Sequence, residues 1–276
     1  MSIKFIKANI FVFFVASILF FIVSFNANAS EKYNYSSVPL LSGLPVDTNS
    51  SYFKLNVDSY THYDIPLLIT NNTNHYVKTK TYIRGASTTE DGNISYNKIN
   101  NPVSKQIINK HVIATTLKPH SNKVIKYKLY TNQDEFKGTQ LAGIVTLFYK
   151  DGTKGINNNV SYTNGLELTE KRKKLDIHKL SFDRFYYDDN NHAYKIKIRN
   201  KTPELFNNMN IKVVVNNSSF SRTYRLKNIS VTPNSSFYIK MPVQDAKIHK
   251  DDLNIFINNK NIFSSNKKIV YFYMYW

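Results

Sequence analysis

The stretch that decides the fold is Val77-Lys78-Thr79-Lys80-Thr81-Tyr82-Ile83-Arg84. Its residues alternate between a face of apolar or small side chains and a face of long polar or aromatic ones, the latter being Lys78, Lys80, Tyr82 and Arg84. A period of two is typical of a β-strand with one buried and one solvent-exposed face. The stretch therefore predicts a half-buried strand.

Similar strand patterns lie on both sides of this stretch. They cover Tyr52–Val57, Tyr63–Thr70, Val124–Tyr130, Gly143–Tyr149 and Asn159–Leu168. The dipeptides Asp91-Gly92 and Asp151-Gly152 lie between strand-like runs and indicate hairpins, because glycine accepts a positive φ. After residue 30 no run of apolar residues keeps helical spacing for more than about two turns. Residues 52–170 therefore predict a first β-sandwich.

A second series of strands follows the basic run at residues 171–174. Its members are expected at Leu175–Phe185, Ala193–Arg199, Met209–Asn216, Thr223–Ser230, Phe237–Val243, Leu253–Ile257 and Lys268–Trp276. Seven short strands in about 100 residues are typical of an immunoglobulin-like sandwich. The sequence thus predicts an all-β protein with two tandem immunoglobulin-like β-sandwich domains, at residues 52–170 and 171–276.

The amino-terminal segment predicts export. Two lysines precede an apolar run from Ile10 to Phe25, and Ala27 and Ala29 then occupy the two positions that a signal peptidase reads. We expect residues 1–29 to be a signal peptide, cleaved between Ala29 and Ser30. The alternative is a membrane-spanning helix that stays as a tether, although such a helix usually needs about 20 apolar residues. Residues 30–51 contain two prolines and no sustained period, which indicates an arm before the first domain.

Composition limits the chemistry. The 276 residues include 37 Lys and Arg against 19 Asp and Glu, for a formal charge of +18, and no Cys. The absence of Cys excludes a disulfide scaffold, a thiol nucleophile and a Cys-based metal site. Export argues against a nucleic-acid partner and leaves an anionic surface or polymer outside the cell. In a chain this rich in Asn, the Asn-x-Ser/Thr triplets at Asn71, Asn93, Asn200 and Asn228 are expected by chance.

No catalytic or metal motif is present. The seven His are scattered, none of them four residues from another, and neither an HExxH nor a GxSxG motif occurs. The run Asp188-Asp189-Asn190-Asn191 resembles calcium-ligand chemistry but lacks the spacing of an EF-hand, so a hairpin loop is favoured. The sequence predicts a non-enzymatic protein without a cofactor or a metal.

Two features are candidates for binding. A basic run offers cations to wall phosphates or carboxylates, although an interdomain connector explains it as well; its residues are Lys171, Arg172, Lys173 and Lys174. Aromatic side chains offer stacking surfaces for sugars, although most tyrosines in such a chain belong to the core or the sheet surface; the candidates are Tyr82, Tyr96 and Tyr162.

The order of several segments resembles the WxL-interacting surface proteins of Gram-positive bacteria. Four segments are similar to their amino-terminal domain: Tyr52–Val57, Leu68–Thr73, Ala86–Tyr96 and Leu117–Lys123. Phe136–Ile144 resembles the family's Phe-x-Gly...Gly-Gly-Ile segment, with Ala142 in place of the first paired glycine. In the second half, Val231–Phe237 resembles an Ala-Pro-Asn-Ser element of the family's second domain.

This resemblance implies a peptidoglycan-binding first domain and a second domain that contacts host matrix proteins or partner proteins, acting with WxL proteins at the cell wall. Family members typically end in a transmembrane helix and a basic tail, whereas this sequence stops at Trp276. We expect either a released protein held by wall binding, an anchor formed by an uncleaved signal segment, or a truncated reading frame.

Two other readings remain open. A periplasmic pilus-assembly chaperone is also an exported, basic pair of immunoglobulin-like domains. In that case Val124–Tyr130 would be an exposed edge strand donated to a subunit. A generic adhesin sandwich is the third reading.

Overall fold

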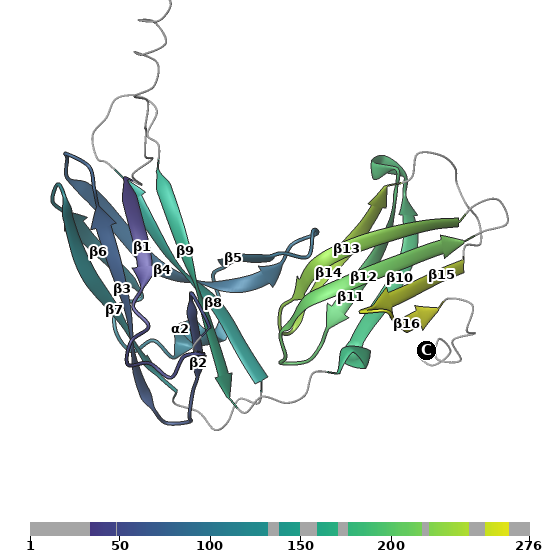
Figure 1. Ribbon diagram of the computed structural model, residues 1–276, viewed down its shortest axis with the longest axis horizontal. Coiled ribbons are helices and arrows are strands. Elements are labelled where there is room, and N and C mark those ends of the chain that lie inside the picture. The colour runs from purple at the N-terminus through teal and green to yellow at the C-terminus, as the bar shows by residue number, and fades with distance from the viewer. Residues whose placement is uncertain are drawn as a thin grey trace, which may run out of the picture. The chain divides into compact units, whose positions relative to one another are not determined.

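The computed structural model describes residues 34–47, 49–131, 138–149, 159–170, 176–216, 221–242 and 252–264. Within these ranges nearly all regular structure is β-strand, which confirms the predicted class (Figure 1). The buried hydrophobic residues form two separate clusters, one between Phe53 and Leu168 and the other between Leu180 and Ile257. Each cluster draws on two sheets, so the described chain contains two β-sandwiches.

In the first sandwich a three-stranded sheet packs against a six-stranded sheet. The smaller sheet contains β1 (Tyr35–Pro39), β3 (His62–Asn71) and β7 (Ser121–Tyr130), in that order. The larger sheet contains β2 (Phe53–Asn56), β9 (Val160–Glu170), β8 (Gly138–Tyr149), β4 (Val77–Thr88) and β5 (Ile94–Lys98) in that order, with β6 (Val112–Leu117) also paired to β4. A single helical turn, α2 (Pro102–Lys105), follows β5.

The predicted alternation along β4 is confirmed. Its residues Val77, Thr79, Thr81 and Ile83 are buried. Polar groups on this inner face are paired across the core, because the Tyr127 hydroxyl donates to the carbonyl oxygen of Thr81 at 2.7 Å. Burial raises the pKa of Tyr127, so its hydroxyl stays protonated and can donate. This bond joins β7 of the small sheet to β4 of the large one.

β1 lies inside the segment that was expected to be an arm. The strand pairs antiparallel with β3, from Tyr35 opposite Asn71 to Pro39 opposite Leu67. Its period is hidden in the sequence because the buried residue is polar: Ser37 is 7% exposed and its hydroxyl meets that of Thr146 at 3.1 Å. The expectation of an arm is therefore wrong for residues 35–39.

The second sandwich has the strand order of an immunoglobulin-like fold. One sheet contains β10 (Leu180–Asp188), β11 (Ala193–Asn200) and β14 (Ser235–Pro242), in that order. The other contains β13 (Ser221–Val231), β12 (Phe206–Asn216), β15 (Asp252–Ile257) and β16 (Lys260–Ser264), in that order. The chain crosses between the sheets as in a Greek key.

The last described strand, β16, was not predicted. It forms a two-residue hairpin with β15 through Asn258 and Asn259, whose φ angles are 48° and 65°. Two consecutive positive φ values fit a type I′ turn, which suits the right-handed twist of the paired strands. The predicted strand Lys268–Trp276 lies outside the described residues and stays a prediction.

Candidate functional site

The basic run and the cleavage site predicted from the sequence lie outside the described ranges. This holds for the basic run, Lys171, Arg172, Lys173 and Lys174, and for the cleavage residues, Ala27, Ala29 and Ser30. Both sites therefore stay predictions. The described residues bring other cationic side chains together, on one sheet face and at the contact between the two sandwiches.

The outer face of the six-stranded sheet, meaning the face turned away from the core, places cations beside aromatic rings. The Arg84 guanidinium carbon lies 4.6 Å from the ring centroid of Tyr82, and the Lys80 ammonium lies 5.7 Å from that of Tyr149. Lys78 is exposed on the same face of β4, opposite Tyr149 in the register. A ring beside a cation suits a sugar that carries a negative charge.

Tyr162, the third candidate for stacking, has a structural role. Its hydroxyl donates to the carbonyl oxygen of Tyr35 at 2.6 Å, and its ring meets the edge of Phe148 at 5.8 Å between centroids. Asn164 likewise donates from Nδ2 to the carbonyl oxygen of Ser37. These side chains of β9 therefore bind the backbone of β1 and hold the two sheets together.

Tyr96 lies over two glycines that are paired across β8 and β9. A Cβ on Gly143 would lie 2.5 Å from Cγ of Tyr96, and a Cβ on Gly165 would lie 3.3 Å from its hydroxyl. Only glycine at position 143 leaves room for the ring. Burial, followed by the charge of Glu167, raises the pKa of Tyr96 to about 12. The ring therefore fixes the β4–β5 hairpin on the outer face.

Ala142 and Gly143 face opposite sides of β8. Ala142 is fully buried in the core of the first sandwich, on the inner face of β8. Gly143 faces the other way, toward Tyr96. A methyl group therefore adds to the core at position 142 but would displace an aromatic ring at position 143.

The tip of the β4–β5 hairpin contacts the second sandwich. Gly92 has a φ of 73°, as the predicted Asp-Gly turn requires, and its carbonyl oxygen accepts a hydrogen bond from the Ser230 amide at 2.8 Å. The Thr88 hydroxyl oxygen accepts one from the Thr232 amide at 2.9 Å. A third bond runs from the Thr139 amide to the carbonyl oxygen of Pro203 at 2.8 Å. We call this contact the junction.

Two buried asparagines organise equivalent corners of the two sandwiches. In the first, Asn71 ends β3 and donates from Nδ2 to the carbonyl oxygens of His75 and Lys118, both at 2.8 Å. Its Oδ1 accepts hydrogen bonds from the amide and the hydroxyl of Thr73, at 3.0 and 2.7 Å. The Ser121 hydroxyl donates to the carbonyl oxygen of Lys118 at 2.8 Å. We call this group the Asn71 corner.

The second sandwich repeats these bonds at the Asn200 corner. Asn200 ends β11 and donates from Nδ2 to the carbonyl oxygens of Glu204 and Thr232, at 2.7 and 3.0 Å. Its Oδ1 accepts from the amide and the hydroxyl of Thr202, at 3.0 and 2.7 Å. The Ser235 hydroxyl donates to the carbonyl oxygen of Thr232 at 2.6 Å. The Asn-x-Thr triplets at Asn71 and Asn200, which were expected to occur by chance, therefore have a structural role.

The turn that follows each corner is repeated as well. His120 has a φ of 48° and Asn234 a φ of 49°, and their amides donate to the carbonyl oxygens of Thr73 and Thr202, at 3.2 and 3.1 Å. A non-glycine residue at positive φ is uncommon, so the coincidence marks a shared local design. The two sandwiches therefore contain the same supersecondary unit.

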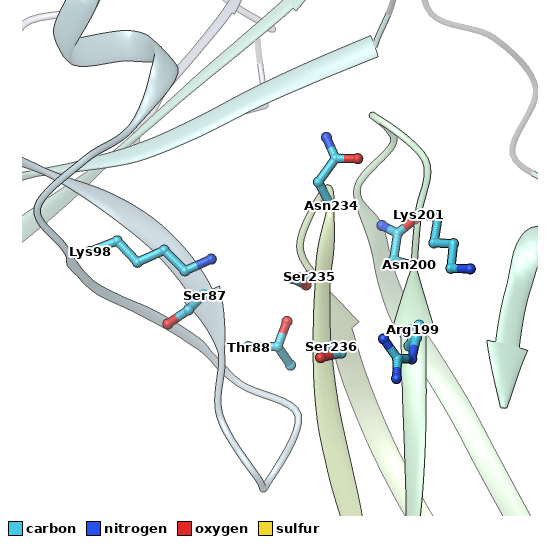
Figure 2. A pocket seen from close by; sticks show the side chains of 9 residues that line it. All are labelled: Ser87, Thr88, Lys98, Arg199, Asn200, Lys201, Asn234, Ser235 and Ser236. Atoms are coloured by element: carbon cyan, nitrogen blue, oxygen red, sulfur yellow. The ribbon is translucent and has the colours of Figure 1, made fainter. Parts of the chain in front are cut away.

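Two cavities open beside the Asn200 corner, where the first sandwich meets it. The first, of about 470 Å³, is lined by three cations, Lys98, Arg199 and Lys201, together with hydroxyl and amide side chains (Figure 2). The second, of about 450 Å³, is lined partly by Lys98 and by backbone near Pro203. None of the residues that line either cavity is Asp or Glu.

The edge of β7, which a pilus chaperone would donate, is partly covered. The Ile108 amide donates to the carbonyl oxygen of Lys128 at 2.9 Å, and the Tyr130 amide donates to that of Gln106 at 2.8 Å. Asn109 donates from Nδ2 to the carbonyl oxygen of Lys126 at 2.9 Å. Residues 126–130 therefore already use the backbone groups that strand addition would need.

The acidic run at residues 188–191 forms a short turn after β10. Asp188 caps it by accepting from the Asn190 amide at 3.1 Å, and its carboxylate pairs with Lys195 at 2.6 Å. The bond from Lys195 lowers the pKa of Asp188 to about 2.

Among the described residues, no three His, Asp or Glu side chains gather closely enough to hold a metal ion. Across those same ranges, no helix has the length and apolar character needed to span a membrane.

Comparison with known families decides the relationship. A model described as the WxL Interacting Protein peptidoglycan binding domain matches residues 35–147, and one described as the WxL Interacting Protein host binding domain matches residues 151–257. The chain belongs to the WxL Interacting Protein family. These two matches support a peptidoglycan-binding and host-binding role at the cell surface. The match to the host binding domain includes β9, which pairs with β8 in the first sandwich.

No curated protein matches the sequence of this family member. Among solved structures, a Salmonella enterica SafB chaperone complex with the SafA pilin aligns at 11% identity and a TM-score of 0.35, covering 75% of this chain and 96% of that one. The E. coli chaperone DraB aligns at 13% identity and a TM-score of 0.34, covering 83% and 96%. At these TM-scores the alignments establish neither a fold nor a function for this chain.

Sequence reasoning missed the cations of the first cavity. Lys98 ends β5, whose bounds were not predicted, and Arg199 and Lys201 flank an asparagine whose triplet was attributed to chance. One signal was available, because each half contains an Asn-x-Thr triplet followed later by Pro-x-Ser, at Asn71 with Ser121 and at Asn200 with Ser235. In the first half Pro102-Val103-Ser104 fits the pattern as well, so an alignment of the two halves on this pattern leaves two positions for the first corner.

Proposed function

We propose that the first sandwich binds an anionic wall polymer on its outer face. The observation that carries this proposal is the aromatic and cationic face of β4 and β8. All of β4 lies within residues 35–147, which match a peptidoglycan binding domain, and Tyr149 lies two residues beyond the end of that match. Stacking on Tyr82 and Tyr149 would hold sugar rings, while Lys78, Lys80 and Arg84 would meet carboxylates or phosphates. The formal charge, which is +16 once Lys4 and Lys7 are removed with the signal peptide, would bring the protein to an anionic wall.

The second sandwich is proposed to bind a protein partner, either a WxL-domain protein or a host matrix protein. Its match to a host binding domain supports this role. Its sheet faces also carry cations beside rings, with the Lys197 ammonium 5.3 Å from the Tyr238 centroid and the Lys212 ammonium 4.3 Å from that of Phe256. We further infer that the protein is exported, that it binds without catalysing a reaction, and that residues 171–174 contribute charge near the boundary at residues 170–171.

The test is co-sedimentation of the protein with purified peptidoglycan at low and high salt. The double variant Tyr82→Ala and Tyr149→Ala should lose about tenfold in affinity, since two ring contacts are removed. The matched control is Tyr130→Ala on the opposite sheet, where the ring stacks on His62 instead. Equal retention of all three proteins would contradict the proposed face, and retention abolished by moderate salt would mean that charge alone is responsible.

A further inference from the structure

The cavity beside the Asn200 corner receives cations from both sandwiches. Lys98 ends β5 of the first sandwich, whereas Arg199 and Lys201 flank the last residue of β11 in the second. Figure 2 shows the Lys98 side chain extending from the hairpin toward the side of the cavity where Ser235 lies. No lining residue is acidic, and although Arg199 forms an ion pair with Asp183 outside the lining, Lys98 and Lys201 leave a positive charge that would attract an anion.

These cations are attached to ordered backbone. Asp183 accepts a hydrogen bond from Nε of Arg199, which positions the guanidinium. Lys201 lies between Asn200 and Thr202, whose mutual hydrogen bonds fix the backbone there. Lys98 is two residues from Tyr96, which is held on the glycine pair of β8 and β9. A site ordered before binding loses less entropy when its ligand arrives.

The rest of the lining indicates the class of ligand. Asn200, Ser235 and Thr88 are occupied by the bonds of the corner and the junction, so the side chains available to a ligand include those of Asn234 and Ser236. Their amide and hydroxyl groups can bond to sugar hydroxyl and acetamido groups as well as to an anion. A volume of about 470 Å³ exceeds what a small inorganic anion needs and suits a sugar unit.

We propose that this cavity binds a sugar that carries a carboxylate or a phosphate, as one unit of an anionic carbohydrate polymer, and that the bound unit joins the two sandwiches at the junction. The identity of the polymer rests on the proposed function, whereas the site itself does not. Because the ligand contacts both sandwiches, its binding strengthens their contact, and the contact in turn strengthens binding.

The experiment is an NMR titration of the full chain with three sugars. N-acetylmuramic acid carries a carboxylate, N-acetylglucosamine 1-phosphate carries a phosphate, and N-acetylglucosamine is neutral. We expect an acidic sugar to shift the amide signals at the end of β5 and at the end of β11, and the acid that binds more strongly identifies the source. Lys98→Gln and Lys201→Gln should each weaken binding about tenfold, because each removes one charge-assisted bond. The control, Lys128→Gln, removes an equal charge from β7, away from the cavity.

Equal binding of neutral and acidic sugars would overturn the inference, and so would an unchanged affinity in both Lys98→Gln and Lys201→Gln. No binding of either acidic sugar to the wild-type chain would overturn it too. Failure of the wall-binding proposal looks different, because then an acidic sugar binds in the cavity while the protein does not sediment with peptidoglycan.

Discussion

The Asn71 and Asn200 corners share their buried hydrogen bonds and differ in what their outer residues contact. At the Asn71 corner, Nε2 of His120 meets Oδ1 of Asn74 at 2.5 Å, a local contact at the surface. The equivalent positions of the Asn200 corner are Asn234 and Pro203. The carbonyl oxygen of Pro203 accepts a bond from the first sandwich, and Asn234 lines both cavities.

This difference separates residues that specify the fold from residues that specify contact. The buried amide of each corner satisfies backbone groups that the turn would otherwise leave unpaired, and any such turn needs them. The outer residues of each corner do not satisfy these backbone groups with their side chains, so they are available to contact another sandwich or a ligand. The repeated unit therefore makes one corner self-contained and the other a junction.

The largest expected effect on stability concerns the buried asparagines that the two corners share. Asn71→Ala and Asn200→Ala should each lower the free energy of unfolding of their own sandwich by about 3 kcal/mol, because each leaves buried backbone groups without partners. Denaturant unfolding would measure this loss of stability, with Asn122→Ala, at an exposed position of β7, as the control. If only one of the two asparagines matters, the corners are not equivalent.

A smaller effect is expected where the first sandwich holds its hairpin. Gly143→Val should cost about 1–3 kcal/mol, because its side chain would overlap the ring of Tyr96. In a Tyr96→Ala background the same substitution should cost less, because the overlap with the ring is gone and only that with Thr163 remains. Thermal unfolding of the four proteins gives the coupling. Additive costs would show that Tyr96 does not lie over Gly143.

The smallest expected effect is electrostatic and confined to the second sandwich. Because the pKa of Asp188 is lowered to about 2, its ion pair with Lys195 stabilises the fold above the ordinary pKa of 3.8. That stability is lost as the pH falls from about 4 to about 2. Lowering the pH from about 4 to about 2 should lower the midpoint temperature of unfolding slightly more in the wild type than in Asp188→Asn, and thermal unfolding at several pH values measures this difference. Parallel decreases would mean that the pair does not contribute.

Strand alternation was enough to predict the all-β class, β4 and most strands of both sandwiches, because inward residues there are apolar or small. It failed at β1, where the inward residue is Ser37, and at β16, where the Asn258-Asn259 turn was not recognised. The cavity could not be predicted from the strand pattern. Its cations come from segments about 100 residues apart, and only the hydrogen bonds of the junction bring them together.

Hydrogen exchange at the junction tests the central claim most directly, because the two cavities and the difference between the corners depend on that contact. The amides of Ser230 and Thr139, which donate to Gly92 and Pro203, should exchange slowly in the wild-type chain. Thr88→Val removes the acceptor of the Thr232 amide and should accelerate exchange at Ser230 and Thr232 while the cores stay protected. Exchange of Ser230 and Thr139 at the rate of free amides in the wild type would contradict the account.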